Sequence, residues 1–176
     1  IRQTGTYWYH SHTSLQEQSG LYGSIVIEPK HKAAVDNLRD HVVLLSDWTD
    51  EDPHTILHTL KRGSEWYAIE KKSAQSILGA ASVGRLSDYF SRELQRMPPM
   101  DLADVYYDTF LTNGQREQTL PAAAKEQIRL RIINGSASTY FYLEYAGGKM
   151  TIISADGQEV DPVEDGRILI GVAETY

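Results

Sequence analysis

The alternation of hydrophobic and polar positions predicts short β-strands at the start of the chain and again in its second half. Residues 127–133 alternate Arg129 and Arg131 with apolar neighbours, which is typical of a half-buried strand. Pairs such as Asn113-Gly114 and Asp156-Gly157 separate the later strands and favour tight turns. The predicted strands span residues 4–12, 23–28, 41–46, 106–112, 127–133, 139–145, 149–154 and 167–172. This pattern predicts an all-β fold, an antiparallel sandwich or barrel.

The middle of the chain has a different period. Asp52 and Pro53 have the composition of a helix N-cap and first helical residue, and Gly63 is a stop signal, so residues 54–62 are predicted to be helical. Residues 64–99 are polar with spaced apolar positions and predict one or two further helices. We therefore expect a helical insertion at about residues 53–99 of a β protein.

The first two predicted strands do not make a domain, because a lone hairpin is only marginally stable in water. They must complete a sheet whose other strands lie elsewhere, or pack on the strands that follow. Residues 30–40 are charged and lack a clear period, which is typical of a linker. A new domain is predicted to begin at about His41.

Composition excludes several function classes. The formal net charge is −7 and the basic residues are scattered, so we expect no nucleic-acid partner. Without cysteine the chain has neither disulfides nor thiolate metal sites, and it cannot hold a blue-copper centre by itself. No apolar run is long enough for a membrane span. The chain begins at Ile1 in the middle of a pattern, and we expect it to be an internal fragment of a longer protein.

His10 and His12 are the leading candidates for chemistry. Side chains two residues apart leave a strand on the same face, so both imidazoles point one way with Trp8, while Ser11 points the other way with Tyr7 and Tyr9. Two converging neutral imidazoles are a common start of a metal site. The spacing allows both to bind one ion or each to bind a different ion. The alternative is a pair of ordinary histidines satisfied by backbone groups.

The surrounding residues carry a family resemblance. The run GTYWYHSH at residues 5–12, followed by QEQSGLYGSIVIEP at residues 16–29, resembles the second copper-ligand motif of three-domain multicopper oxidases, the family of laccases and bacterial copper-resistance oxidases. The stretches at residues 45–53, 101–105, 129–137 and 150–176 are similar to the periplasmic copper-resistance protein A branch. Residues 55–98 match only loosely.

This resemblance implies a cupredoxin-like Greek-key β-sandwich or barrel with a helical insertion. Residues 1–30 would be the closing strands of a first cupredoxin-like domain, 31–40 a linker, and 41–176 a second such domain that is incomplete at its C-terminal end. His10 and His12 would each bind one copper of the type 3 pair in a three-copper cluster. The type 1 copper would lie outside this chain.

The resemblance also implies a function for the parent protein. Such an oxidase couples one-electron oxidation of a substrate, either Cu(I) or a small molecule such as a phenol, to four-electron reduction of dioxygen to water. We expect a role in periplasmic copper resistance, with the remaining domains of the parent chain as partners. Since only one of the four histidine motifs of the family is present, the chain alone is expected to be inactive.

Other interpretations remain open. The chain could be a copper-binding or purely structural cupredoxin-like module without oxidase activity, and a downstream His-Cys-His motif in the parent reading frame would decide. Copper nitrite reductases are a related alternative, but their comparable motif places Cys directly after the ligand histidine, and this chain has Ser11 at that position. His54 and His58 share a predicted helical face, Met97 and Met100 offer thioethers for Cu(I), and the acidic residues 47–52 form either a hard-cation site or a helix N-terminal cluster.

Overall fold

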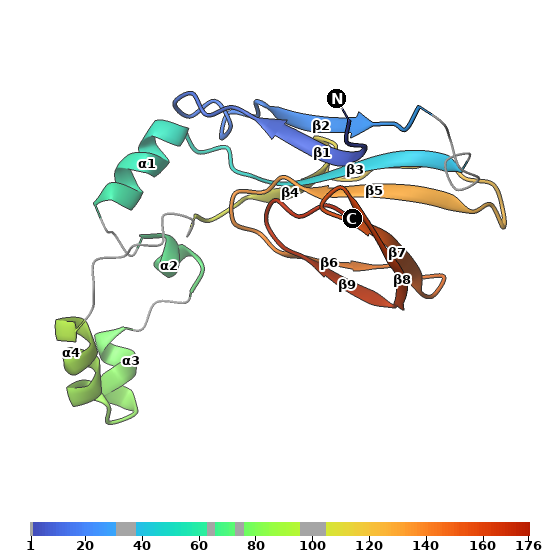
Figure 1. Cartoon of the computed structure of the whole chain (residues 1–176). Helices are drawn as coiled ribbons and strands as arrows, with labels where there is room; N and C mark the ends of the chain where they lie inside the picture. The colour runs from blue at the N-terminus through green and yellow to red at the C-terminus, as the bar shows by residue number, and fades with distance from the viewer. Residues whose placement is uncertain (1, 31–37, 63–65, 73–75, 96–104) are drawn as a thin grey trace. The chain divides into compact units, whose positions relative to one another are not determined.

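The computed structural model describes residues 2–30, 38–62, 66–72, 76–95 and 105–176. The chain divides into two compact units, a β unit formed by Ile1–Thr49 with Tyr107–Tyr176 and a helical unit formed by Asp50–Tyr106 (Figure 1). The all-β fold with a helical insertion, which the hydrophobic pattern predicts, is therefore confirmed.

The β unit begins with a hairpin of β1 (Gly5–His10) and β2 (Tyr22–Ile27). The two strands pair antiparallel, from Gly5 opposite Ile27 to His10 opposite Tyr22. Tyr9 lies opposite Gly23, and a side chain at Gly23 would collide with the Tyr9 ring, because an added Cβ would stand 2.6 Å from the Tyr9 hydroxyl. The small residue at this position therefore makes room for an aromatic partner.

A three-stranded sheet follows, in which β3 (Arg39–Trp48) lies between β4 (Thr109–Thr112) and β5 (Ile128–Asn134). β4 pairs antiparallel with β3, but β5 pairs with β3 in parallel. The expectation of a wholly antiparallel sandwich is wrong at this pair. Parallel neighbours need a long crossover connection, and the chain between β3 and β5 supplies one that includes the whole helical unit.

The remaining strands form two pairs, β6 (Phe141–Glu144) with β9 (Arg167–Ile170) and β7 (Met150–Ala155) with β8 (Gln158–Asp165). β8 is not predicted by the hydrophobic pattern. All eight of its residues are exposed, so it has no buried face to produce an alternation, and it contains Pro162. The turn Asp156-Gly157, with positive φ at both residues, joins β7 to β8.

The core of the β unit lies between the three-stranded sheet and the pair β6 and β9. Leu45 of β3, Ile132 of β5 and Ile170 of β9 are buried in contact with one another. The side chains packed around them are Val43, Leu130, Phe141, Leu143 and Tyr176. The members from β3, β5 and β6 stand two residues apart within each strand, so in each strand they lie on the face that is turned to the core.

Asp40, the second residue of β3, binds two arginines of β5. It accepts hydrogen bonds from Arg129, its direct cross-strand neighbour, and from Arg131 at 3.0 and 3.1 Å. Desolvation alone would raise the pKa of Asp40, but the hydrogen bonds and charges of the two arginines outweigh it and hold the pKa below its usual value.

These contacts place the start of β3 two residues earlier than expected. Residues 31–37 of the expected linker lie outside the described part of the chain, whereas Arg39 and Asp40 are already paired with β5. Hydrophobic periodicity does not predict this extension of β3, because polar side chains stabilise it through the ion pairs of Asp40 with Arg129 and Arg131. The limits of the two cupredoxin-like domains remain a proposal.

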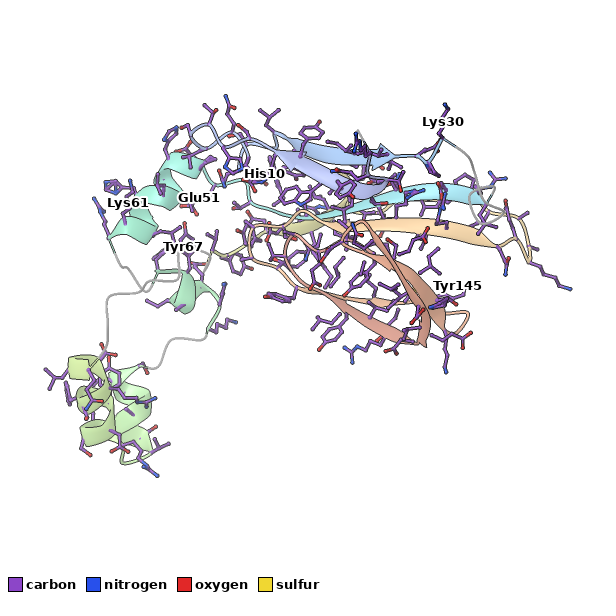
Figure 2. All side chains as sticks on the ribbon, in the orientation of Figure 1. His10, Lys30, Glu51, Lys61, Tyr67 and Tyr145 are labelled. Atoms are coloured by element: carbon purple, nitrogen blue, oxygen red, sulfur yellow. The ribbon has the colours of Figure 1, made fainter. Side chains whose placement is uncertain are left out.

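The helical unit contains α1 (Pro53–Lys61), α2 (Trp66–Glu70), α3 (Ile77–Ser82) and α4 (Leu86–Gln95). The predicted cap is confirmed, since the Asp52 side chain accepts a hydrogen bond from the Thr55 amide at 2.9 Å. The hydroxyl group of buried Tyr67 donates a hydrogen bond to Glu51 at 3.0 Å (Figure 2). Of the helices that the structure describes, none has the length and apolar content to cross a bilayer.

Candidate metal centre

β1 places the two candidate histidines side by side. The Trp8 and His10 rings are stacked, with centroids 4.5 Å apart and planes at 17°, and the His10 and His12 rings also have centroids 4.5 Å apart, at 44°. Trp8, His10 and His12 therefore share one face, as the residue parity predicts. The strand itself ends at His10, two residues before its predicted end, although the Ser11 amide still donates to the Leu21 carbonyl at 3.1 Å.

The loop between β1 and β2 gives His10 a carboxylate partner. Glu17 Oε2 lies 2.7 Å from His10 Nδ1 (Figure 2 marks His10 at the end of β1). Because a carboxylate only accepts hydrogen bonds, Nδ1 carries the proton in this contact and donates it. The lone pair of the imidazole is then on Nε2, which is the arrangement of a metal-binding histidine. The donor chemistry therefore fits copper.

β1 is attached to the core of the β unit through Thr6. Arg131 donates to the buried Thr6 hydroxyl at 2.9 Å, and the Thr175 hydroxyl donates to the Thr6 carbonyl at 3.2 Å. Arg131 is in turn held by Asp40 of β3. These bonds connect β1 to β3, to β5 and to the end of the chain, so His10 extends from a supported strand while His12, just beyond it, is exposed.

Among the described residues, no set of donors forms a complete metal site. Within the described ranges there is no group of three or more His, Cys, Asp or Glu side chains that could hold a metal ion. His54 and His58 both lie exposed on α1, and the described residues supply no further ligand for them. Met97 and Met100 lie outside the described residues.

The acidic stretch 47–52 is divided between two roles. Asp52 caps α1, as expected. Asp47 is buried in the other unit, where it accepts hydrogen bonds from the amides of Ala137, Ser138 and Thr139 at 2.9 to 3.2 Å and from the Thr139 hydroxyl at 2.8 Å. Its lone pairs are therefore used within the turn, which argues against the hard-cation site.

Comparison with known proteins identifies the family. One multicopper oxidase sequence profile matches residues 39–176, and a second matches residues 1–32. The chain belongs to the multicopper oxidase family. Copper is the cofactor of this family, and it fits the imidazoles of His10 and His12.

The chain aligns with parts of longer proteins. It is 46% identical to copper resistance protein A of Escherichia coli over its whole length, and 43% identical to copper resistance protein A of Pseudomonas syringae pv. tomato. The chain spans 31% and 30% of the length of these two relatives. The crystal structure of Fet3p, a multicopper oxidase that functions in iron import, matches 99% of this chain and 26% of that one with a TM-score of 0.69 at 20% identity. The cupredoxin-like fold is thus confirmed.

Sequence reasoning misses Glu17 as the partner of His10. The residue lies seven positions further along, in a loop predicted only as polar, and no periodic pattern relates the two. The available signal was a single carboxylate in the short connection after a histidine pair, since metal-binding histidines commonly donate their other ring N–H to an acceptor.

Proposed function

We propose that His10 and His12 bind the type 3 copper pair of a multicopper oxidase, one imidazole to each copper. The observation that carries this proposal is the adjacency of the His10 and His12 rings at the end of β1, with His10 Nε2 left as a ligand atom by the bond from Nδ1 to Glu17. The other ligands would come from parts of the parent protein outside the described residues, since these hold no third donor.

The parent protein would act as a copper-resistance oxidase in the periplasm. When bound, the copper centres would take single electrons from a substrate and reduce dioxygen to water with four of them. This chain would contribute two ligands and the strand that holds them, and Trp8 would cover one face of the His10 ring. The names of the two relatives support copper resistance, and Cu(I) or phenols are the proposed substrates.

The domain organisation follows from the same proposal. Residues 1–30 would be the closing strands of one cupredoxin-like domain and residues 41–176 most of the next. Two separate profile matches, which meet near the expected linker, support this division. The type 1 copper would lie elsewhere in the parent chain, because a blue-copper centre needs a cysteine and this chain has none.

The ligand assignment is tested with His10→Ala and His12→Ala in the full-length parent protein. Either substitution should leave one copper of the pair under-coordinated and stop oxygen reduction. The type 1 centre should survive, so each variant should keep its blue absorption band and be reduced by substrate, yet fail to reoxidise in air. Copper content, absorption and paramagnetic resonance spectra provide the measurement.

Two outcomes would contradict the assignment. Reoxidation at the wild-type rate would show that neither histidine is a ligand needed for oxygen chemistry. Loss of the blue band with oxygen chemistry retained would instead place the histidines at the type 1 copper.

A copper-binding module without oxidase activity is the second candidate, and the absence of a third donor among the described residues favours it for the chain alone. Sequencing the parent reading frame separates the two candidates. A downstream His-Cys-His motif establishes the oxidase, and its absence leaves binding or a structural role.

A further inference from the structure

We infer that Glu17 is the positioning residue that presents Nε2 of His10 to copper. The inference rests on the proposed function, in which His10 is a ligand. It assigns the loop between β1 and β2 a part in the metal site, through a residue that does not itself bind the metal.

Two contacts determine the orientation of the His10 ring. Trp8 stacks on its face with the planes 17° apart, which fixes the plane of the ring. Stacking alone permits the ring to turn over by half a rotation, which would exchange the positions of Nδ1 and Cδ2 and those of Nε2 and Cε1. The 2.7 Å contact between Glu17 Oε2 and Nδ1 selects one of these two orientations and the tautomer protonated at Nδ1.

The loop is built to hold Glu17 in this place. The Ser11 hydroxyl donates to Gln16 Oε1 at 2.7 Å and accepts from the Thr13 amide at 3.1 Å. The Leu21 amide donates to the Gln16 carbonyl at 2.9 Å. Two successive residues at the end of β1 thus contact two successive residues of the loop. His10 contacts Glu17, and Ser11 contacts Gln16.

A negatively charged acceptor has a further effect on a ligand histidine. A carboxylate bonded to Nδ1–H increases the basicity of Nε2, and loss of such a partner commonly weakens metal binding about 10- to 100-fold. The side chains of His10 and Glu17 are 31% and 23% exposed, so water can only partly replace the lost acceptor.

The test compares Glu17→Ala and Glu17→Gln in the full-length, copper-loaded parent protein. Copper retention is titrated with a competing chelator, paramagnetic resonance reports the coupling of the copper pair, and circular dichroism and thermal unfolding of the copper-free protein report the fold. E17A should release copper at about 10- to 100-fold lower chelator concentration. E17Q should be intermediate, because its amide oxygen still accepts from Nδ1–H but carries no charge.

Glu164→Gln is the matched control and should behave as wild type. It removes an exposed carboxylate from β8, which lies away from the loop between β1 and β2 (Figure 1). His10→Ala separates this inference from the proposed function. If H10A loses copper while E17A and E17Q retain it with wild-type spectra, Glu17 has no positioning role and the ligand assignment stands. If H10A also retains all copper, both the inference about Glu17 and the assignment of His10 as a ligand are contradicted.

A structural role for Glu17 gives a different result. It would lower the unfolding temperature of the copper-free protein without a change in the spectrum of the copper pair, and that outcome overturns the inference. Should E17A fail to fold, E17Q decides, because wild-type copper retention in the folded E17Q protein also overturns it.

Discussion

Asp47 shows at the scale of one residue why a carboxylate in an acidic stretch need not be a cation site. Its four hydrogen bonds close the turn that follows β5, where Asn134 is fully buried and donates to the carbonyls of Thr139 and Ile170 at 2.8 and 3.3 Å. Residues 134–136 also match a glycosylation sequon, but the buried and bonded Asn134 side chain is part of the turn.

The Asp47 carboxylate also affects its neighbour Tyr107. Burial raises the pKa of Tyr107 to about 12, the negative charge of Asp47 adds to the rise, and a hydrogen bond with Ser138 opposes it. In the unfolded chain tyrosine ionises near pH 10. Between pH 10 and 12 the unfolded state therefore loses protons first, and the folded state loses stability as the pH rises.

We expect Tyr107→Phe to remove this pH dependence. With respect to this group, the wild-type free energy of unfolding should be constant below pH 10 and should fall by about 1 to 2 kcal/mol between pH 10 and pH 12, because solvent screens the partly exposed phenol. Urea unfolding at several pH values between 8 and 12 measures it. Tyr140→Phe, at an exposed position of the same unit, is the control. Equal slopes in wild type and Y107F would contradict the prediction.

At the scale of elements, the start of β1 lies against the turn between β7 and β8. Gly5 has φ of +138°, and an added Cβ would stand 2.8 Å from both the Cα and the carbonyl oxygen of Gly157. These are backbone atoms that cannot rotate away. The absence of a side chain at Gly5 is therefore what lets β1 begin in contact with this turn.

Gly5→Ala should consequently destabilise the β unit by about 2 to 4 kcal/mol, from backbone strain and overpacking together. Gly114→Ala is the matched control, because Gly114 has φ of +78° but nothing within 4 Å of an added Cβ. It should cost about 1 kcal/mol, from strain alone. Urea unfolding of both variants at neutral pH measures the difference, and equal unfolding midpoints would show that Gly157 moves aside at little cost.

The elements also show how far sequence reasoning reaches. Strands with one buried face, such as β5, and the capped helix α1 follow from periodicity and cap chemistry. β8 does not, because it is exposed on both faces, and the parallel pairing of β3 with β5 does not, because periodicity carries no information on strand direction. In the same way parity predicts the shared face of His10 and His12, whereas the contact with Glu17 depends on the course of a loop.

For the molecule as a whole, the number of available donors determines how the isolated chain should bind copper. His10 and His12 supply two imidazoles where copper prefers three or four ligands, so binding should be weak and without a defined stoichiometry. Titration with Cu(II) and with Cu(I) against a competing chelator measures this. A tight stoichiometric site that persisted in the double variant His10→Ala, His12→Ala would contradict it and would locate copper binding elsewhere in the chain.

Along the chain, the helical unit is inserted between β3 and β4. At the two ends of this insertion, the Asp108 amide donates to the Trp48 carbonyl at 2.9 Å and the Thr49 hydroxyl donates to Asp108 at 2.8 Å. These hydrogen bonds hold the two ends of the helical insertion together. The entropy lost on closing a loop grows only with the logarithm of its length, so halving or doubling the number of residues between these ends changes the cost by about 0.6 kcal/mol. Evolution can therefore lengthen, shorten or exchange this segment while β1, which carries His10, keeps its support.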